Sequence, residues 1–217
     1  MSATDIAPAR SGQSVACEWA GYIATGFRFA SFPAGARVLD VGFGHGEQMK
    51  HVAGAGGRAF GVEYDGSLAK KARTAGLRVC RAAAERLPFA SASFDGLICK
   101  VVSPYTDESS AVGEIARVLR PGGVAQVSYH GLGYSLRYLL TDRNWKRRVY
   151  GARTIVNTIV YRASGRRLPG FWGDTIYQSP SRLLAYYRRS GLELVEAHPS
   201  GRFAGAPVFI YHTLRKR

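Results

Sequence analysis

A glycine-rich turn is the feature of this sequence that says most about chemistry. Gly42, Gly44 and Gly46 alternate with other residues in the run VLDVGFGHGE, just after Asp40 ends a β-rich stretch and before a helical one. Glycines permit positive φ and close approach of a ligand, and the helix start offers free N–H groups. A dinucleotide-binding turn instead has the spacing G-x-G-x-x-G. A carboxylate beside the turn would repel a diphosphate but pair with an amine, so the pattern favours a ligand with a cationic amino-acid tail over NAD.

A second acidic residue, Glu63, ends the next β-rich stretch. A carboxylate at this place can accept hydrogen bonds from both ribose hydroxyls of an adenosine. The adjacent Tyr64 can lie against the adenine ring. Taken alone, Glu63 could be an ordinary strand-end acid and Asp65 a helix cap. A strand, a glycine turn and an acid one strand later are together much more specific, and they predict an adenosine site.

The elements that must position these residues alternate between short β-rich runs and helical stretches. The expected strands are 37–41, 59–63, 77–81, 94–102, 124–129, 192–197 and 207–214, and the expected helices are 45–53, 67–74, 108–119 and 181–190. This alternation predicts parallel β-α-β units in one doubly wound α/β domain that spans 1–217. The last two runs leave no room for a crossover helix, so they should form an antiparallel pair at one end of the sheet. Apolar residues at helical spacing predict an N-terminal amphipathic helix over 14–30.

The alternation is interrupted by an insertion at 131–178. Nine Arg and Lys residues lie here against two acids, Asp142 and Asp174, and tyrosines and tryptophans are interleaved with them. Such a segment could grip a phosphate- or sugar-linked acceptor, lie on an anionic membrane or stack RNA bases. It could equally be a packed helical subdomain with a solvated basic outer face. The stretch 154–161, TIVNTIVY, is apolar enough to predict a buried helical segment.

Four motifs in order resemble the class I S-adenosylmethionine-dependent methyltransferases, in particular the ubiquinone-biosynthesis-like group with a methyltransferase domain 11 pattern. VLDVGFGHG resembles the glycine motif and VEYD the ribose-binding acid. AERLPFASASFDGLICKVV resembles the adenine loop and fourth strand, and EIARVLRPGGVAQVSY the helix, turn and fifth strand that follow. The resemblance covers about 37–130. It implies a Rossmann-like seven-stranded sheet whose last strand is antiparallel, with a helical lid inserted after the fifth strand.

The resemblance also implies S-adenosylmethionine as the cofactor and assigns its contacts. The expected cofactor-binding residues are Asp40, Gly42, Gly44 and Gly46 at the methionine end, Glu63 and Tyr64 at the ribose and adenine face, Ala84 and Glu85 at the adenine edge, and Lys100 facing the crevice. One departure matters, because Ala83 stands where the family usually has an aspartate that accepts from the adenine amino group. Backbone groups or Glu85 would have to substitute for it, or cofactor affinity would be lower.

Methyl transfer is an in-line displacement, so the protein mainly aligns the nucleophile and excludes water. An alcohol or phenol acceptor needs a base, whereas an amine or thiol often needs only prior deprotonation. The catalytic candidates are His130, which ends the predicted fifth strand, and Tyr105, which follows the fourth. His130 could also be a hydrogen-bonded structural histidine, and Tyr105 could be a wall of the acceptor site. The other histidines and the cysteines lack metal-ligand spacing, so no metal is expected.

Composition limits the classes of protein that remain. The 30 Lys and Arg against 15 Asp and Glu give a formal net charge of +15, which leaves nucleic acid, an anionic membrane and an acidic small molecule open as partners. Three widely spaced cysteines predict neither a disulfide framework nor a metal pair. We see no signal-peptide-like start and no apolar run of transmembrane length, so a cytoplasmic location is expected.

These observations predict an S-adenosylmethionine-dependent methyltransferase that acts on a small-molecule or lipid-linked acceptor, with oxygen favoured as the acceptor atom. A peripheral contact with an anionic membrane is an additional expectation. No accessory nucleic-acid-binding motif accompanies the domain, which argues against a specific nucleic-acid partner. The alternatives are an RNA methyltransferase and a non-catalytic protein that binds the cofactor or RNA. The oligomeric state has no signature in the sequence.

Overall fold

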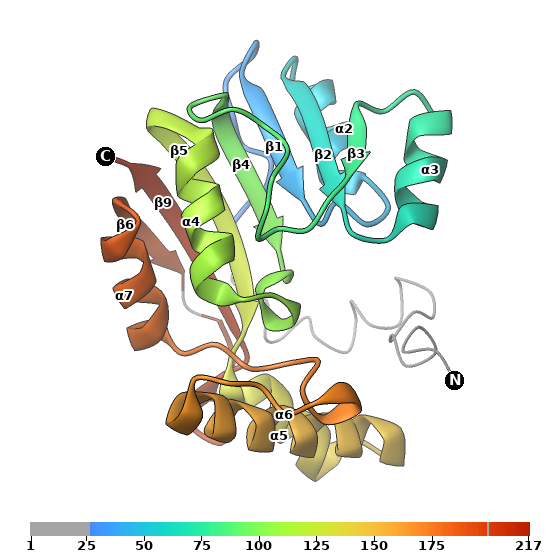
Figure 1. The fold of residues 1–217 in the computed structure, drawn as a ribbon, viewed down its shortest axis with the longest axis vertical. Helices are drawn as coiled ribbons and strands as arrows, with labels where there is room; N and C mark the ends of the chain where they lie inside the picture. The colour runs from blue at the N-terminus through green and yellow to red at the C-terminus, as the bar shows by residue number, and fades with distance from the viewer. Residues whose placement is uncertain (1–26, 199) are drawn as a thin grey trace.

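A seven-stranded mixed sheet forms the centre of the molecule (Figure 1). The computed structural model describes residues 27–198 and 200–217. The strand order is β3-β2-β1-β4-β5-β9-β6, and β9 runs antiparallel to both of its neighbours. The predicted doubly wound, Rossmann-like sheet, with the antiparallel pair β6 and β9 at one end, is therefore confirmed.

The sheet strands are β1 (Arg37–Val41), β2 (Arg58–Glu63), β3 (Val79–Arg81), β4 (Phe94–Lys100), β5 (Leu119–His130), β6 (Leu192–His198) and β9 (Phe209–Lys216). The helices are α2 (Glu47–Gly54), α3 (Gly66–Thr74), α4 (Glu108–Val118), α5 (Leu132–Thr141), α6 (Trp145–Ser164) and α7 (Pro180–Arg189), with short 3-10 turns η3 (Ser103–Tyr105) and η4 (Gly170–Trp172). None of the helices within the described part of the chain is long and apolar enough to cross a membrane.

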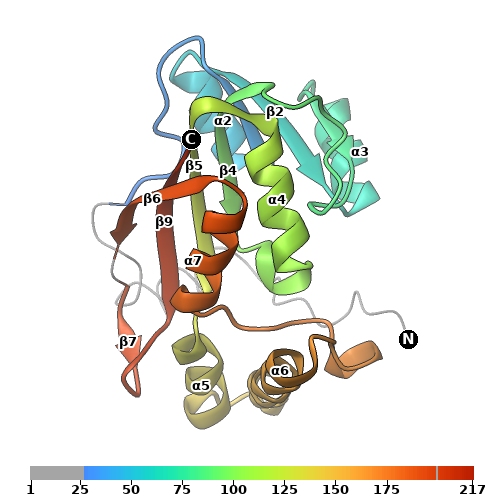
Figure 2. The same cartoon turned by 60° about the vertical axis from the view of Figure 1, so that its left-hand side comes forward.

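Helices cover both faces of the sheet, and alternate residues of its central strands point into the two cores that result. Leu39 and Leu97 face the core shared with α4 and α7, whereas Val38 and Ile98 face a smaller core with Val52 of α2. Figure 2 shows α4 and α7 side by side on one face. This two-sided burial explains why β1 and β4 read as nearly continuous apolar runs in the sequence.

Several details differ from the sequence-based expectation. Most of the predicted helix 14–30 lies outside the described residues, and 27–30 form a loop and turn rather than a helix. β5 begins at Leu119, directly after α4, and not at 124, because Leu119 already pairs with Phe94 across a register shift. A small hairpin of β7 (Arg202–Phe203) and β8 (Ala206–Pro207), which the sequence did not predict, links β6 to β9.

The insertion folds as the antiparallel helices α5 and α6 followed by η4 and an irregular segment. It lies beyond the carboxyl ends of the parallel strands (Figures 1 and 2). The prediction that the apolar side chains of 154–161 are buried is wrong. The buried residues of this stretch are the polar Thr154, Asn157 and Thr158, whereas the apolar Val156 and Ile159 are exposed. The reason is that α6 packs its polar side inward, where it hydrogen-bonds the segment that follows it.

Close approach of α5 and α6 depends on Gly151. A Cβ at this position would lie 2.5 Å from the carbonyl oxygen of Ser135 and 2.9 Å from the amide nitrogen of Leu139. A Cβ on Gly113 of α4, by contrast, would meet nothing within 4 Å.

Gly151→Ala should therefore lower the free energy of unfolding by about 1–3 kcal/mol through overpacking, although alanine is the better helix former. The matched variant Gly113→Ala should raise the free energy of unfolding by about 0.5–1 kcal/mol. Urea denaturation measures both changes. Equal stabilisation by the two substitutions would contradict the close packing of α5 on α6.

Candidate active site

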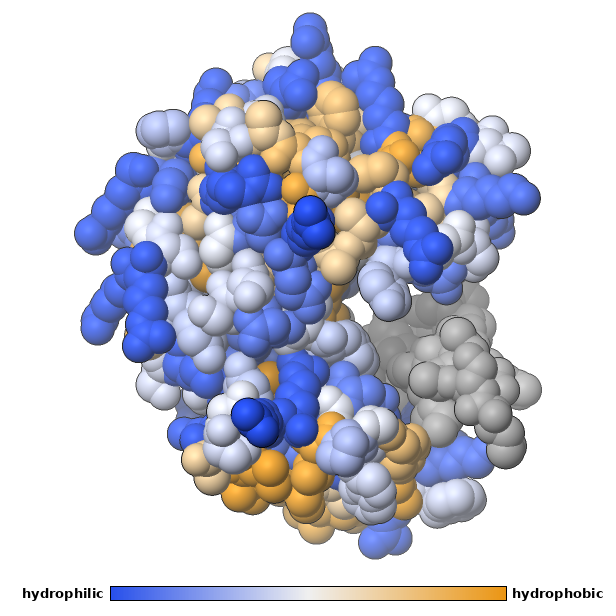
Figure 3. Space-filling view, viewed as in Figure 1, coloured by the Kyte–Doolittle hydropathy of each residue, from blue (hydrophilic) through white to orange (hydrophobic). Residues whose placement is uncertain are grey.

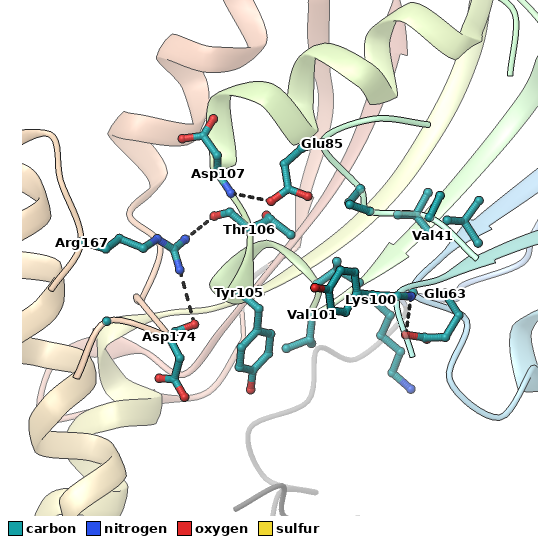
Figure 4. A pocket seen from close by; sticks show the side chains of 18 of the residues that line it. Val41, Glu63, Glu85, Lys100, Val101, Tyr105, Thr106, Asp107, Arg167 and Asp174 are labelled. Carbon is teal, nitrogen blue, oxygen red and sulfur yellow. Dashed lines mark hydrogen bonds between the residues drawn. The ribbon is translucent and has the colours of Figure 1, made fainter. Parts of the chain in front are cut away.

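A cavity of about 1140 Å³ opens at the carboxyl ends of β1, β2 and β4. One wall comes from the strand ends and from the loop after β3, at 82–85. The opposite wall comes from the loop after β4 and from the insertion (Figure 4). Ligands of doubly wound sheets bind in the crevice outside the carboxyl ends of the strands, so the cavity lies where a ligand is expected.

The glycine turn borders this cavity through Gly42, and its three glycines adopt backbone conformations that other residues rarely take. Gly42, Gly44 and Gly46 have φ of 72°, 54° and 76°. A Cβ on Gly42 would overlap Cγ2 of Val102, and the amide of Gly42 donates to the carbonyl oxygen of Val62 at 2.7 Å. Gly42 lines the cavity, while Gly46 caps the start of α2. The turn is thus held tightly against the end of β4 and leaves its open side to a ligand.

Asp40 lies in β1, two residues before Gly42, and one of its carboxylate oxygens lacks a hydrogen-bond partner. The residue is 3 % exposed, and its Oδ2 atom is buried without a partner. Burial raises the pKa of this carboxyl to about 7, with the Glu63 carboxylate contributing in the same direction and the Lys100 ammonium opposing both. A buried carboxylate of this kind is stabilised by a cation, as an ammonium group would supply.

The Glu63 side chain turns back towards the backbone of the site. Its carboxylate accepts hydrogen bonds from the amides of Tyr64 at 2.8 Å, Asp65 at 3.1 Å and Gly44 at 3.0 Å. Glu63 and Tyr64 both line the cavity, and Tyr64 is 72 % exposed. The acid is therefore fixed at the end of β2, where ribose hydroxyls could reach it.

The adenine end of the predicted site is formed by Ala83, Ala84 and Glu85, which all line the cavity. Oε1 of Glu85 accepts from the amide of Asp107 at 3.0 Å (Figure 4). A carboxylate is thus present on this wall although Ala83 replaces the aspartate of the family pattern. Lys100 lines the cavity from the end of β4.

The opposite end of the cavity is built by residues that the sequence did not single out as site residues. Tyr161, Arg167 and Asp174 of the insertion line it together with Tyr105. The Arg167 guanidinium donates to the carbonyl oxygens of Pro104 at 3.1 Å, Asp174 at 3.4 Å and Thr106. Arg167 therefore joins the insertion to the loop after β4 (Figure 4). The one signal in the sequence was that Asp174 is one of only two acids in a strongly basic segment.

Tyr105, predicted as catalytic, lines the cavity and is 51 % exposed. Its hydroxyl is 3.3 Å from that of Tyr150, which in turn is 3.4 Å from Oγ1 of Thr175. Desolvation by the surrounding wall, with a further contribution from Tyr150, raises the pKa of the Tyr105 phenol well above its usual value. Tyr105 is thus a neutral hydroxyl that can hold a ligand by donating a hydrogen bond.

His130, the other predicted catalytic residue, is not among the residues that line the cavity. Its ring is stacked on Tyr134 with centroids 3.7 Å apart and also packs against Phe209. Burial lowers the pKa of His130 to about 3. This environment does not support the prediction of His130 as a base and favours the structural alternative.

The structure thus brings most of the predicted residues together. Those that line the cavity are Gly42, Glu63, Tyr64, Ala84, Glu85, Lys100 and Tyr105. Gly44 and Asp40 are not among the lining residues: the Gly44 amide donates to the Glu63 carboxylate, and Asp40 is close enough to Glu63 and Lys100 for their charges to affect its pKa. No group of three or more His, Cys, Asp or Glu side chains in the described part of the chain is arranged to hold a metal ion.

Comparison with known proteins agrees with this geometry. Residues 39–127 match the family model described as a methyltransferase domain. An uncharacterized methyltransferase of Mycobacterium sp. (strain JLS) is 37% identical over 127 residues, which are 56% of this chain and 50% of the relative. The chain therefore spans about half the length of this curated relative.

Two solved structures share the fold. An S-adenosylmethionine-dependent methyltransferase of Methanosarcina mazei has a TM-score of 0.62 at 17% identity, covering 85% of this chain and 94% of that one. The 1,6-didemethyltoxoflavin-N1-methyltransferase of Burkholderia thailandensis, with bound S-adenosylhomocysteine, has a TM-score of 0.54 at 20% identity and covers 84% and 72%. The resemblance to S-adenosylmethionine-dependent methyltransferases that the four motifs predicted is confirmed.

The residues present fit this cofactor. The orphaned Oδ2 of Asp40 suits the ammonium of a methionine tail, and the Glu63 carboxylate lines the cavity, where it could accept from ribose hydroxyls. The Glu85 carboxylate and the backbone of 83–85 are available on the adenine wall.

Cofactor binding should depend on pH through Asp40. Its pKa is near 7 without ligand, and an adjacent ammonium would lower that pKa, so binding in the acidic range must release a proton. The affinity for S-adenosylhomocysteine should therefore rise from about pH 6 to about pH 8, by at most about tenfold per pH unit below 7. Titration calorimetry in buffers of different ionisation enthalpy measures both affinity and proton release.

Asp40→Asn should weaken binding and remove this pH dependence. The control His45→Gln alters the histidine of the same turn and should keep the dependence. If Asp40→Asn retained it, another group would carry the proton.

Proposed function

We propose that this protein is an S-adenosylmethionine-dependent methyltransferase whose acceptor is a small or lipid-linked molecule with a hydroxyl group, bound between Tyr105 and the insertion. The observation that carries the proposal is that one continuous cavity runs from Glu63 and Ala84 to Arg167 and Asp174. Its volume of about 1140 Å³ exceeds the roughly 300–1,000 Å³ of most single-ligand pockets. A cofactor and an acceptor can therefore occupy it together.

The cofactor end anchors its ligand by charge and hydrogen bonding. Asp40 and Glu63 hold the amino-acid tail and the ribose, while the glycine turn lets the ligand lie against the backbone. When bound, S-adenosylmethionine supplies a methyl group on a sulfonium, which passes in line to a nucleophile while the electrons of the broken bond stay on sulfur. The contribution of the protein is alignment and exclusion of water.

At the acceptor end, Asp174 is the best-placed group to take the proton from a hydroxyl. Its Oδ2 accepts from Nη2 of Arg153 at 2.9 Å, and 43% of its side chain remains exposed to accept a further hydrogen bond. Tyr105, which Asp174 influences electrostatically, can donate to the same acceptor. Asp174 thus takes the role of base that the sequence suggested for His130.

A nitrogen acceptor is the second candidate. The Burkholderia neighbour is named as an N-methyltransferase, and the fold alone does not decide the acceptor atom. An amine acceptor needs no base in the bound state. Substitution of Asp174 therefore separates the two possibilities.

Cofactor identity is tested by calorimetry with S-adenosylhomocysteine and with NADH. The sulfur ligand should bind and NADH should not. Glu63→Ala should weaken S-adenosylhomocysteine binding by up to about 3 kcal/mol, because a hydrogen bond to a charged group contributes about 1.5–3 kcal/mol. Binding of NADH, or no heat with the sulfur ligand, would refute the assignment.

Acceptor class is tested by transfer of radiolabelled methyl from S-adenosylmethionine to a panel of phenols, alcohols and amines, free and attached to prenyl chains. With a hydroxyl acceptor, Asp174→Asn should lower kcat roughly 10²–10⁴-fold, as loss of a general base does, and leave the dissociation constant of S-adenosylhomocysteine unchanged. Tyr105→Phe, the shape-preserving control, should lower kcat less and raise KM.

A loss below tenfold in Asp174→Asn, with an amine as the preferred acceptor, would overturn the hydroxyl proposal. Methyl transfer to RNA but to no member of the panel would instead favour the RNA methyltransferase alternative.

A further inference from the structure

Helix α6 buries its polar side and exposes its apolar side, which is the reverse of an ordinary surface helix. Its buried side chains are polar, namely Arg153, Thr154, Asn157 and Thr158. Large apolar side chains on its other side are exposed to solvent: Trp145 by 68%, Ile159 by 58% and Val156 by 47%. A surface helix usually buries its apolar side, so this arrangement leaves a hydrophobic surface without a partner among the described residues.

The apolar residues on this outer side follow one line along the helix, which we call the outer stripe. It consists of Trp145, Val149, Ala152, Val156, Ile159 and Ala163. At 100° per residue, these positions fall within an arc of roughly 80° over five turns. Leu140, 61% exposed, lies near the end of α5, just before the loop that leads into α6. Figure 3 shows apolar surface gathered at the lower edge of the molecule, where α5 and α6 lie in Figure 1.

Cations border the outer stripe. Lys146 and Arg162 project from either flank of the helix, Arg148 lies nearer the stripe, and Arg143 and Arg166 stand just beyond the two ends. All five are exposed, and we call them the basic rim.

The acids of the insertion do not neutralise this rim. Asp142 pairs with Arg147 at 3.3 Å and Asp174 pairs with Arg153 at 2.9 Å. These are the only two acids in the sequence of 131–178. The surface therefore combines exposed apolar area with an excess of positive charge.

We propose that the outer stripe and basic rim of α6 dock the protein on an anionic lipid membrane, with α6 lying in the plane of the headgroups. An interfacial helix is expected to combine an apolar line that includes tryptophan with flanking lysines and arginines. Each basic residue near an anionic surface strengthens binding by about fivefold. The apolar line enters the boundary of the acyl chains while the rim meets the headgroup charges.

Two other occupants fit this surface less well. In a two-fold dimer, each copy would present the same patch, so the five cations of one rim would face the five of the other. A single-stranded nucleic acid needs aromatic platforms for its bases, but the middle of the stripe is aliphatic, with Val156 and Ile159. The charge and the side-chain chemistry together favour lipid.

Docking would place the active site near the membrane. The side of α6 opposite the outer stripe carries Tyr161, which lines the cavity, and Gly165 and Arg167 follow directly after the helix on the same wall. A lipid-linked acceptor could thus reach the cavity from the bilayer. This consequence rests on the proposed function, whereas docking itself does not.

The test is co-sedimentation of the full chain with vesicles at about 0.15 M salt. One set of vesicles contains phosphatidylcholine and about one third phosphatidylglycerol, and the other contains phosphatidylcholine alone. The protein should bind the anionic vesicles, and binding should weaken as salt is raised. Arg143→Gln/Lys146→Gln/Arg162→Gln should weaken the apparent affinity roughly 100-fold, since three rim charges are removed.

Two controls separate docking from general effects. Lys70→Gln/Lys71→Gln/Arg73→Gln removes the same charge from exposed positions of α3 and should change binding much less. Val156→Glu/Ile159→Glu should abolish vesicle binding at already exposed positions, whereas Val195→Glu, at a 48% exposed position of β6, should not. Circular dichroism and thermal unfolding check that each variant is folded, and because neither needs a cofactor, they keep this test independent of the methyltransferase proposal.

Failure of the wild-type protein to bind anionic vesicles would overturn the proposal, as would equal losses in the α3 and rim variants. Gel filtration that shows a dimer which Val156→Glu/Ile159→Glu dissociates would assign the surface to a second copy instead. Loss of RNA binding in the rim variant with vesicle binding intact would likewise overturn it.

Discussion

The arrangement of the active site depends on how a buried segment without regular structure forms hydrogen bonds for its backbone N–H and C=O groups. Residues 175–178 are buried yet belong to no helix or strand, and buried N–H and C=O groups must be paired. The amide of Ile176 donates to the carbonyl oxygen of Pro104 at 3.1 Å, and the amide of Gln178 donates to that of His130 at 2.9 Å. Neighbouring elements therefore supply the hydrogen-bond acceptors that an adjacent β-strand would otherwise provide.

Helix α6 supplies further partners from its side chains, and this requirement determines which way it faces. Nδ2 of Asn157 donates to the carbonyl oxygen of Thr175 at 2.7 Å, and Oγ1 of Thr158 accepts from the amide of Tyr177 at 3.0 Å. Because these polar side chains must point inward, the valine and isoleucine that flank them, Val156 and Ile159, point outward. The same constraint thus builds the cavity wall that we propose for the acceptor and exposes the apolar line of α6.

The sequence predicted what depends on local pattern and missed what depends on distant contacts. β1 and the glycine turn were identified because a buried parallel strand and its ligand turn have a continuous signature. Arg167 and Asp174 join the site from a segment far along the chain, and only the folded structure shows that Arg167 reaches Pro104 and Thr106. For His130, the position at a strand end was correct, but its ring is stacked on Tyr134 away from the cavity.

The two ends of the cavity differ in whether their charged and polar groups already have partners within the protein. At the cofactor end, Asp40 is buried with an unpartnered oxygen, and burial raises its pKa to about 7 although the Lys100 ammonium opposes the rise, so a further cation would stabilise its ionised form. At the end that we propose for the acceptor, the polar groups are mostly committed to the protein: Arg167 donates to three carbonyl oxygens, and Asp174 is paired with Arg153. A preorganised wall of this kind recognises a ligand by shape and by its few remaining polar groups. We therefore expect selectivity for the cofactor to arise from charge, and selectivity for the proposed acceptor to arise from the contour between Tyr105 and the insertion.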